Sequence, residues 1–110
     1  MGDMAVRDAV IAKKILYEIK DIEDYVQGMQ KTDFCNDSKT QKAVVMSLIN
    51  IGELSRSFTK EFIESKSMIP WKKAQAMRNV ATHKYEIIDM KIVWDTIQIS
   101  IAELKTELEQ

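Results

Sequence analysis

Apolar residues recur at steps of three and four along most of this chain, and this spacing limits the fold more than any other feature. In the N-terminal third the series is Ala12, Ile15, Ile19, Ile22, Val26 and Met29. Such steps place side chains on one face of an α-helix, which turns once every ~3.6 residues. The spacing predicts a long first helix with Asp3 as N-cap and a stop near Gly28.

A second helix is expected to begin near Asp37 or Ser38. The polar stretch Lys31–Ser38 before it is interpreted as a loop, from which Phe34 folds back onto the helices. The apolar stripe of the second helix again advances by three and four, through Val44, Leu48, Ile51, Ser55, Phe58 and Phe62. This rhythm predicts one helix across the whole stretch.

The second helix carries a further apolar line, Val45, Ile49 and Gly52, beside this stripe. Two apolar faces suggest either a central position among the helices or an additional partner. Gly52 costs roughly 1 kcal/mol relative to alanine inside a helix, and close approach of another backbone is the usual reason to keep such a glycine. Glu53 continues a line through Met46 and Ile49, so it either points inward or lies at the helix edge.

Two further helices complete the pattern. Pro70 and Trp71 mark the start of a third helix, since proline is favoured in a first turn. Asp89 can cap a fourth, with the stripe Met90, Trp94, Ile97, Ile101, Leu104 and Leu108. Short connections between amphipathic helices favour antiparallel neighbours. The expected fold is therefore all-α: an up-and-down antiparallel bundle of four to five helices, in a single domain over residues 1–110.

Composition excludes several other classes of protein. With 110 residues, 45% hydrophobic and 30% charged, the chain fits one helical domain and argues against disorder. One proline and three glycines are too few for a turn-rich β fold. No apolar run is long enough to span a bilayer or to form a secretory signal. A lone Cys35 allows no internal disulfide, and a single histidine allows no zinc spacing. The cytoplasm is the expected compartment.

The chemically richest stretch runs from Arg78 through Asn79, His83 and Lys84 to Tyr85, and it contains the only histidine. Arginine offers a fixed positive fork for phosphate, and imidazole moves protons near neutral pH. With no metal-ligand cluster nearby, these residue types suit metal-free cleavage of a phosphodiester. The other interpretation is that Arg78 and His83 are ordinary surface residues of a helix.

Charge is segregated toward this stretch. The net charge is −1, but five basic residues against two acidic ones between Lys72 and Lys91 leave a local balance of +3. Such a cluster is either a phosphate-binding surface or a solvated helix face.

The spacing of Arg78 and His83 limits how the two side chains can share a site. On a regular helix, five steps leave the two side chains roughly 140° apart, too far for one small site. Either the helix ends near Ala81 or Thr82, or the motifs of two subunits face each other across a two-fold axis.

The stretch Arg78-Asn79-x3-His83-x-Tyr85 resembles the Arg-x4-6-His signature of HEPN domains, in the Arg-x4-His-x-Tyr form of the HepT-like toxins. The surrounding sequence agrees with this family. Its matching segments are Ile51-Gly52-Glu53 in the second helix, Ile69-Pro70-Trp71 shortly before the motif, and Asp89 through Trp94 after it. The similarity extends from about Asp37 to Leu104, and no motif position is lost.

This resemblance implies a helical-bundle homodimer that acts as a metal-independent endoribonuclease on RNA, without a cofactor. His83 would move the proton of a ribose 2′-OH or of the leaving oxygen, and Arg78 would neutralise charge on the phosphoryl oxygens. Asn79 would orient the imidazole or hold the helix end. Tyr85 would bind phosphate or pack at a helix end, and Lys84 and Glu53 complete the expected supporting residues.

The resemblance also implies a partner. HepT-like toxins are paired with a minimal nucleotidyltransferase antitoxin, which in some pairs transfers AMP to the motif tyrosine, here Tyr85. Other HEPN domains are non-catalytic and present a substrate or nucleotide to a separate nucleotidyltransferase. That function, and a structural or regulatory helical bundle of another kind, remain the alternatives to a ribonuclease toxin.

Overall fold

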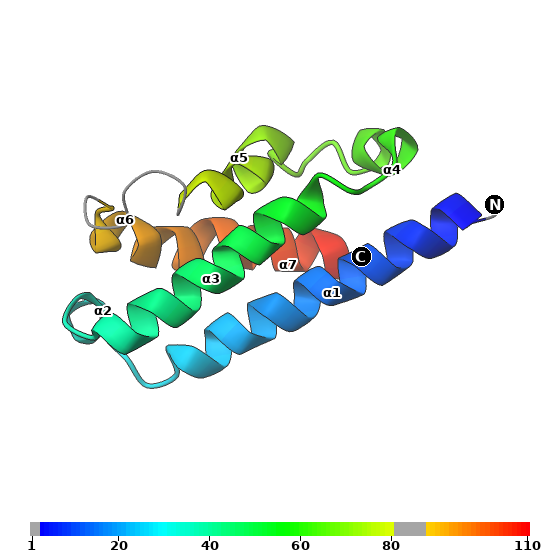
Figure 1. Cartoon of the computed structure of the whole chain (residues 1–110). Helices are drawn as coiled ribbons and strands as arrows, with labels where there is room; N and C mark the ends of the chain where they lie inside the picture. Colours follow the sequence, from blue (N-terminus) through cyan, green and yellow to red (C-terminus); the bar gives the residue numbers. More distant parts are fainter. Residues whose placement is uncertain (1–2, 81–87) are drawn as a thin grey trace.

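Long helices run lengthwise through the computed structural model, which describes residues 3–80 and 88–110 (Figure 1). These elements are α1 (Asp3–Tyr25), α3 (Ser38–Ser55) and a C-terminal run of α6 (Met90–Asp95), the π-helical turn η3 (Thr96–Ile101) and α7 (Ala102–Glu109). Every regular element of the described residues is a helix, which confirms the all-α prediction. None of these helices is long and apolar enough to cross a membrane.

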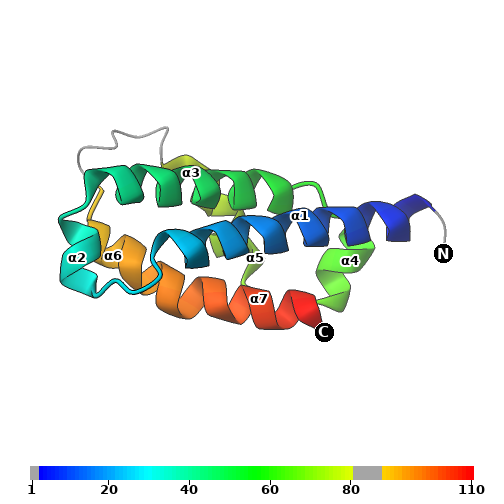
Figure 2. The ribbon, with the colours of Figure 1, turned by 90° about the horizontal axis from the view of Figure 1, so that it is seen from below.

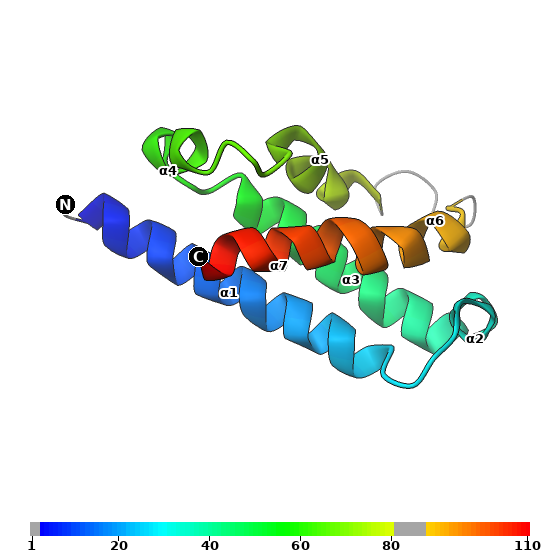
Figure 3. The same cartoon turned by 180° about the vertical axis from the view of Figure 1, so that it is seen from behind.

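The elements alternate in direction, as an up-and-down bundle requires. α3 contacts α1 on one side, and on the other it contacts α5 (Trp71–Ala76) and the 3-10 turn η1 (Met77–Val80), so it is central (Figure 1). Viewed from below, α1 lies between α3 and α7 (Figure 2). From behind, the run from α6 to α7 crosses α1 and α3 (Figure 3).

The core is built from the stripes that the apolar spacing predicts. On α1 and α3 the buried side chains include Ile11, Ile15, Ile19, Ile22, Val44, Leu48 and Ile51. The C-terminal run contributes Val93, Ile97, Ile101, Leu104 and Leu108. Because each helix is amphipathic, packing these stripes together supplies most of the stability that short helices lack alone.

The prediction of a loop over Lys31–Ser38 is wrong in part, because α2 (Lys31–Cys35) is a short helix. The carboxylate of Asp33 accepts a hydrogen bond of 2.8 Å from the backbone N–H of Gln30 and so supports its first turn. Phe34 is fully buried, as expected, and its ring centroid lies 5.5 Å from that of Trp94. The first helix also ends at Tyr25, before the turn in which Gly28 adopts a φ of +80°.

The start of α3 agrees with the sequence, since Asp37 is its N-cap. The Thr40 backbone N–H donates to Asp37 Oδ1 at 3.1 Å, and this hydrogen bond lowers the pKa of the Asp37 carboxyl from its ordinary value. The other end differs from the prediction: α3 stops at Ser55, and a separate helix, α4 (Lys60–Ser65), follows Thr59.

A buried carboxylate explains why α4 starts at this point. Asp8 of α1 is only 6% exposed. It accepts hydrogen bonds from the backbone N–H of Thr59 at 2.9 Å and from Thr59 Oγ1 at 2.6 Å. Thr59 Oγ1 in turn accepts from the Phe62 N–H and caps α4. Asp8 therefore ties the first helix to the break after α3.

We expect Asp8→Ala to lower the free energy of unfolding by about 1.5–3 kcal/mol, because it leaves the donors of Thr59 without their charged acceptor. Asp21→Ala, which removes an exposed carboxylate from the same helix, is the matched control and should change stability little. Urea denaturation followed by circular dichroism measures both. Equal midpoints for the two variants would contradict this role of Asp8.

Candidate functional site

The candidate site lies on the segment that was predicted as the third helix, in which the α-helix α5 is followed by the 3-10 turn η1. α5 follows Pro70, as predicted, and Trp71 anchors its start: Trp71 Nε1 donates to the carbonyl oxygens of Ile63 and Lys66, both at 3.1 Å. The α-helix ends at Ala76, earlier than the end near Ala81 or Thr82 that was one of the two alternatives. Arg78 therefore lies on the tighter 3-10 turn η1, and the angular offset calculated for a regular helix does not apply to it.

The backbone of this turn lies directly against α3 at Gly52. A Cβ atom added to Gly52 would lie 3.0 Å from the carbonyl carbon of Met77 and 3.1 Å from the Cα of Arg78, and it would also meet the backbone nitrogen of Arg78. Only a residue without a side chain permits this contact. The predicted close approach of another backbone is confirmed, and that backbone is the one that carries Arg78.

This contact also accounts for the second apolar line of α3. Val45 and Gly52 are buried and Ile49 is half-buried, while α5 and η1 cover that side of the helix. Of the two explanations offered by the sequence, a central position is therefore confirmed.

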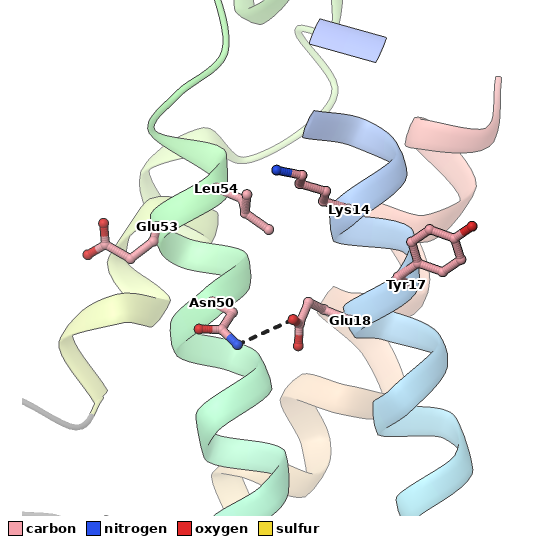
Figure 4. Close-up of a pocket in the computed structure, with 6 residues that line it drawn as sticks. All are labelled: Lys14, Tyr17, Glu18, Asn50, Glu53 and Leu54. Atoms are coloured by element: carbon pink, nitrogen blue, oxygen red, sulfur yellow. Dashed lines mark hydrogen bonds between the residues drawn. The ribbon is translucent and has the colours of Figure 1, made fainter. Parts of the chain in front are cut away.

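Arg78 and Glu53 form an ion pair at the surface. Arg78 Nη1 donates to Glu53 Oε1 at 3.2 Å, with 39% of the Arg78 side chain and 58% of the Glu53 side chain exposed. Glu53 is thus a carboxylate at the helix edge and does not point inward. In Figure 4 its carboxylate turns away from α1. The pair leaves the Arg78 side chain partly exposed to solvent.

An open groove of about 430 Å³ lies between α1 and α3, and Glu53 is at its edge (Figure 4). Its lining residues are Lys14, Tyr17, Glu18, Asn50, Glu53 and Leu54. Asn50 Nδ2 donates to Glu18 Oε2 at 3.2 Å and bridges the two helices. Sequence reasoning missed Lys14 and Tyr17, because on an amphipathic helix they read as solvent-facing residues.

The remaining predicted site residues divide into two groups. Asn79 follows Arg78 in η1 and is exposed. His83, Lys84 and Tyr85 lie outside the described residues. Among the described site residues, the structure therefore brings together Arg78 and Glu53.

Two described helical elements flank residues 81–87. η1 precedes this segment, and α6 follows it, with Asp89 Oδ1 accepting from the Lys91 N–H at 2.9 Å as the predicted N-cap. Within residues 3–80 and 88–110, no three His, Cys, Asp or Glu side chains gather as metal ligands would.

Comparison with known proteins gives a consistent match over most of the chain. A family model described as "Ribonuclease HepT-like" matches residues 15–110. Two proteins that carry the name "Putative RNase", MJ0127 of Methanocaldococcus jannaschii and TTE0752 of Caldanaerobacter subterraneus subsp. tengcongensis, are each 35% identical to this chain over 96 residues. Each alignment covers 87% of this chain, with 79% of the first relative and 86% of the second.

A third relative carries a more specific name. The "Probable ribonuclease HepT" of Thermococcus cleftensis is 34% identical over 89 residues, which cover 81% of each chain. No solved structure gives a significant match.

Proposed function

Because the chain belongs to the HepT-like ribonuclease family, we propose that it is a metal-independent endoribonuclease and the toxin of a toxin–antitoxin pair. The observation that carries this proposal is the exposed guanidinium of Arg78, on a turn whose backbone is seated against Gly52. His83 follows five residues later. Residues 1–110 would form one HEPN-like domain acting in the cytoplasm.

The reaction follows from the chemistry of the two side chains. His83 takes the proton from a ribose 2′-OH, whose oxygen then attacks the adjacent phosphorus, or it donates a proton to the departing 5′ oxygen. Arg78 neutralises the charge that builds on the phosphoryl oxygens, and its anchored turn reduces the reorganisation that this requires. Asn79 is suited to orient the imidazole or hold the turn. The products are a 2′,3′-cyclic phosphate and a 5′-hydroxyl.

Expression in cells tests the toxin part of the proposal. The chain alone should arrest growth, and coexpression of the minimal nucleotidyltransferase encoded beside it should restore growth. His83→Ala is the control and should be harmless. Normal growth with abundant wild-type protein would instead fit a non-catalytic HEPN partner of a nucleotidyltransferase.

A homodimer would complete the site, since each chain has one histidine and two copies would supply both an acid and a base. The coverage of the second apolar face of α3 by α5 and η1 removes one argument for a dimer, so the proposal rests on the histidine count. Small-angle scattering should give twice the chain mass of 12.7 kDa. A monomer that cleaves RNA would contradict it.

The partner nucleotidyltransferase is proposed to inactivate the toxin by transferring AMP to Tyr85. The added phosphate would occupy the space of an RNA phosphate, held by Arg78 and Lys84 through charge-assisted hydrogen bonds. Tyr85→Phe should therefore stay folded and escape neutralisation. Mass spectrometry of the chain, coexpressed with its partner, measures the modification directly. Full neutralisation with Tyr85 unmodified would mean that the partner acts by occlusion.

A further inference from the structure

The guanidinium of Arg78 already has an anionic partner in the free protein. Its contact with Glu53 is a single hydrogen bond, from Nη1 to Oε1, whereas an arginine has five N–H donors. Both side chains reach solvent, and an exposed pair of this kind contributes little to stability and breaks easily. Glu53 therefore holds Arg78 in place but does not saturate it.

A phosphate that approaches Arg78 must also approach Glu53. The two anions would then share one guanidinium a few ångströms apart, and their repulsion would oppose binding. Unless Glu53 moves, it weakens the contact that the proposed ribonuclease activity needs. The carboxylate and the RNA phosphate are competitors for the same cation.

The groove between α1 and α3 gives the Glu53 carboxylate another place to lie. Glu53 forms one edge of this groove, and Lys14 of α1 lines it too. In Figure 4 the Lys14 side chain extends toward α3, near Leu54. Among the ion pairs of the described residues, none involves Lys14. A rotation of the Glu53 side chain into the groove would bring its carboxylate toward a cation of α1.

We propose that Glu53 is an exchangeable placeholder for RNA phosphate: it pairs with Arg78 in the free protein and turns toward Lys14 when RNA binds. This inference rests on the proposed ribonuclease function. It adds that the Glu53 carboxylate occupies the Arg78 guanidinium before the substrate binds. Glu53 is a positioning residue, because it acts through Arg78 and does not touch the reacting atoms.

Binding of a single-stranded RNA oligonucleotide, followed by fluorescence anisotropy, tests the exchange. All variants carry His83→Ala so that the RNA stays intact. Adding Glu53→Gln should tighten binding about two- to five-fold at low salt, the range expected when an exposed ion pair no longer has to break. The gain should shrink as salt rises, because exposed charges are screened. In a chain that also carries Arg78→Ala, Glu53→Gln should have no effect.

Glu18→Gln is the matched control for charge. It removes the same charge from a residue of the same groove. Glu18 accepts from Asn50, and among the described residues it pairs with no lysine or arginine. Binding by Glu53→Gln that is no tighter than binding by Glu18→Gln would overturn the exchange. If no variant binds RNA, the proposed function itself fails, so the two failures are distinguishable. Thermal unfolding confirms that each variant is folded.

A second pair of variants tests the role of Lys14. Lys14→Met should weaken RNA binding about two-fold when Glu53 is present, because the displaced carboxylate then lacks a cation. It should change nothing in the chain with Glu53→Gln, a non-additivity that marks two coupled residues. Equal losses in both chains would show that Lys14 contacts RNA by itself and would overturn the proposed movement toward it.

Discussion

Arg78→Ala and His83→Ala are each expected to reduce RNA cleavage by about two to four orders of magnitude, while the helical fold remains. Loss of a general acid or base lowers rates by ~10²–10⁴-fold, and loss of a group that stabilises the transition state lowers them by ~10²–10³-fold. Arg78 is partly exposed, and its ion pair with Glu53 contributes little to stability. Single-turnover cleavage of an RNA oligonucleotide, with circular dichroism of each variant, measures both effects.

The basic segment offers controls for this experiment. Lys72→Ala and Lys91→Ala each remove one positive charge near the motif, from exposed side chains. They should weaken RNA binding slightly and leave the rate at which bound RNA is cleaved unchanged. If these controls lose as much activity as Arg78→Ala, the arginine has no special role and only charge matters.

Gly52→Ala is expected to have the second largest effect. Alanine favours a helix by roughly 1 kcal/mol over glycine, so propensity alone predicts a more stable protein. The new Cβ, however, would meet the backbone of Met77 and Arg78, which cannot rotate away as a side chain can. η1 would have to separate from α3, and overpacking of this kind typically costs about 1–3 kcal/mol. We expect reduced stability together with loss of cleavage.

Denaturation and cleavage assays on the same preparation measure both consequences of Gly52→Ala. Lys42→Ala, at an exposed position of α3, controls for the change in helix propensity. A Gly52→Ala protein that is more stable than the wild type and fully active would show that the contact between α3 and η1 is not needed.

The helices were predictable where local sequence determines them. Apolar steps of three and four locate the stripes of α1, α3 and the C-terminal run, and Asp37 and Asp89 cap helices as expected. The break after Ser55 was not predictable from periodicity, because Phe58 and Phe62 continue the rhythm from a separate segment. Nor was the contact that follows the break, in which Asp8 binds Thr59 at the start of α4 from 51 residues away.

The candidate site, too, was predictable from the sequence only in part. Gly52 inside an apolar helix predicts a close backbone contact, and the structure identifies η1 as the neighbour. The ion pair between Glu53 and Arg78 joins residues 25 positions apart, and many other carboxylates in the chain were equally available. Only the folded arrangement of α3 beside η1 selects this one.

The chemistry of the purified wild-type chain tests the ribonuclease assignment most directly. The protein is incubated with a defined RNA in the presence of EDTA, and the ends of the fragments are identified by mass spectrometry. Internal cleavage that leaves a 2′,3′-cyclic phosphate and a 5′-hydroxyl is the expected result. Intact RNA with EDTA but cleavage after added Mg²⁺, or fragments that carry a 5′-phosphate, would contradict a mechanism built on Arg78 and His83.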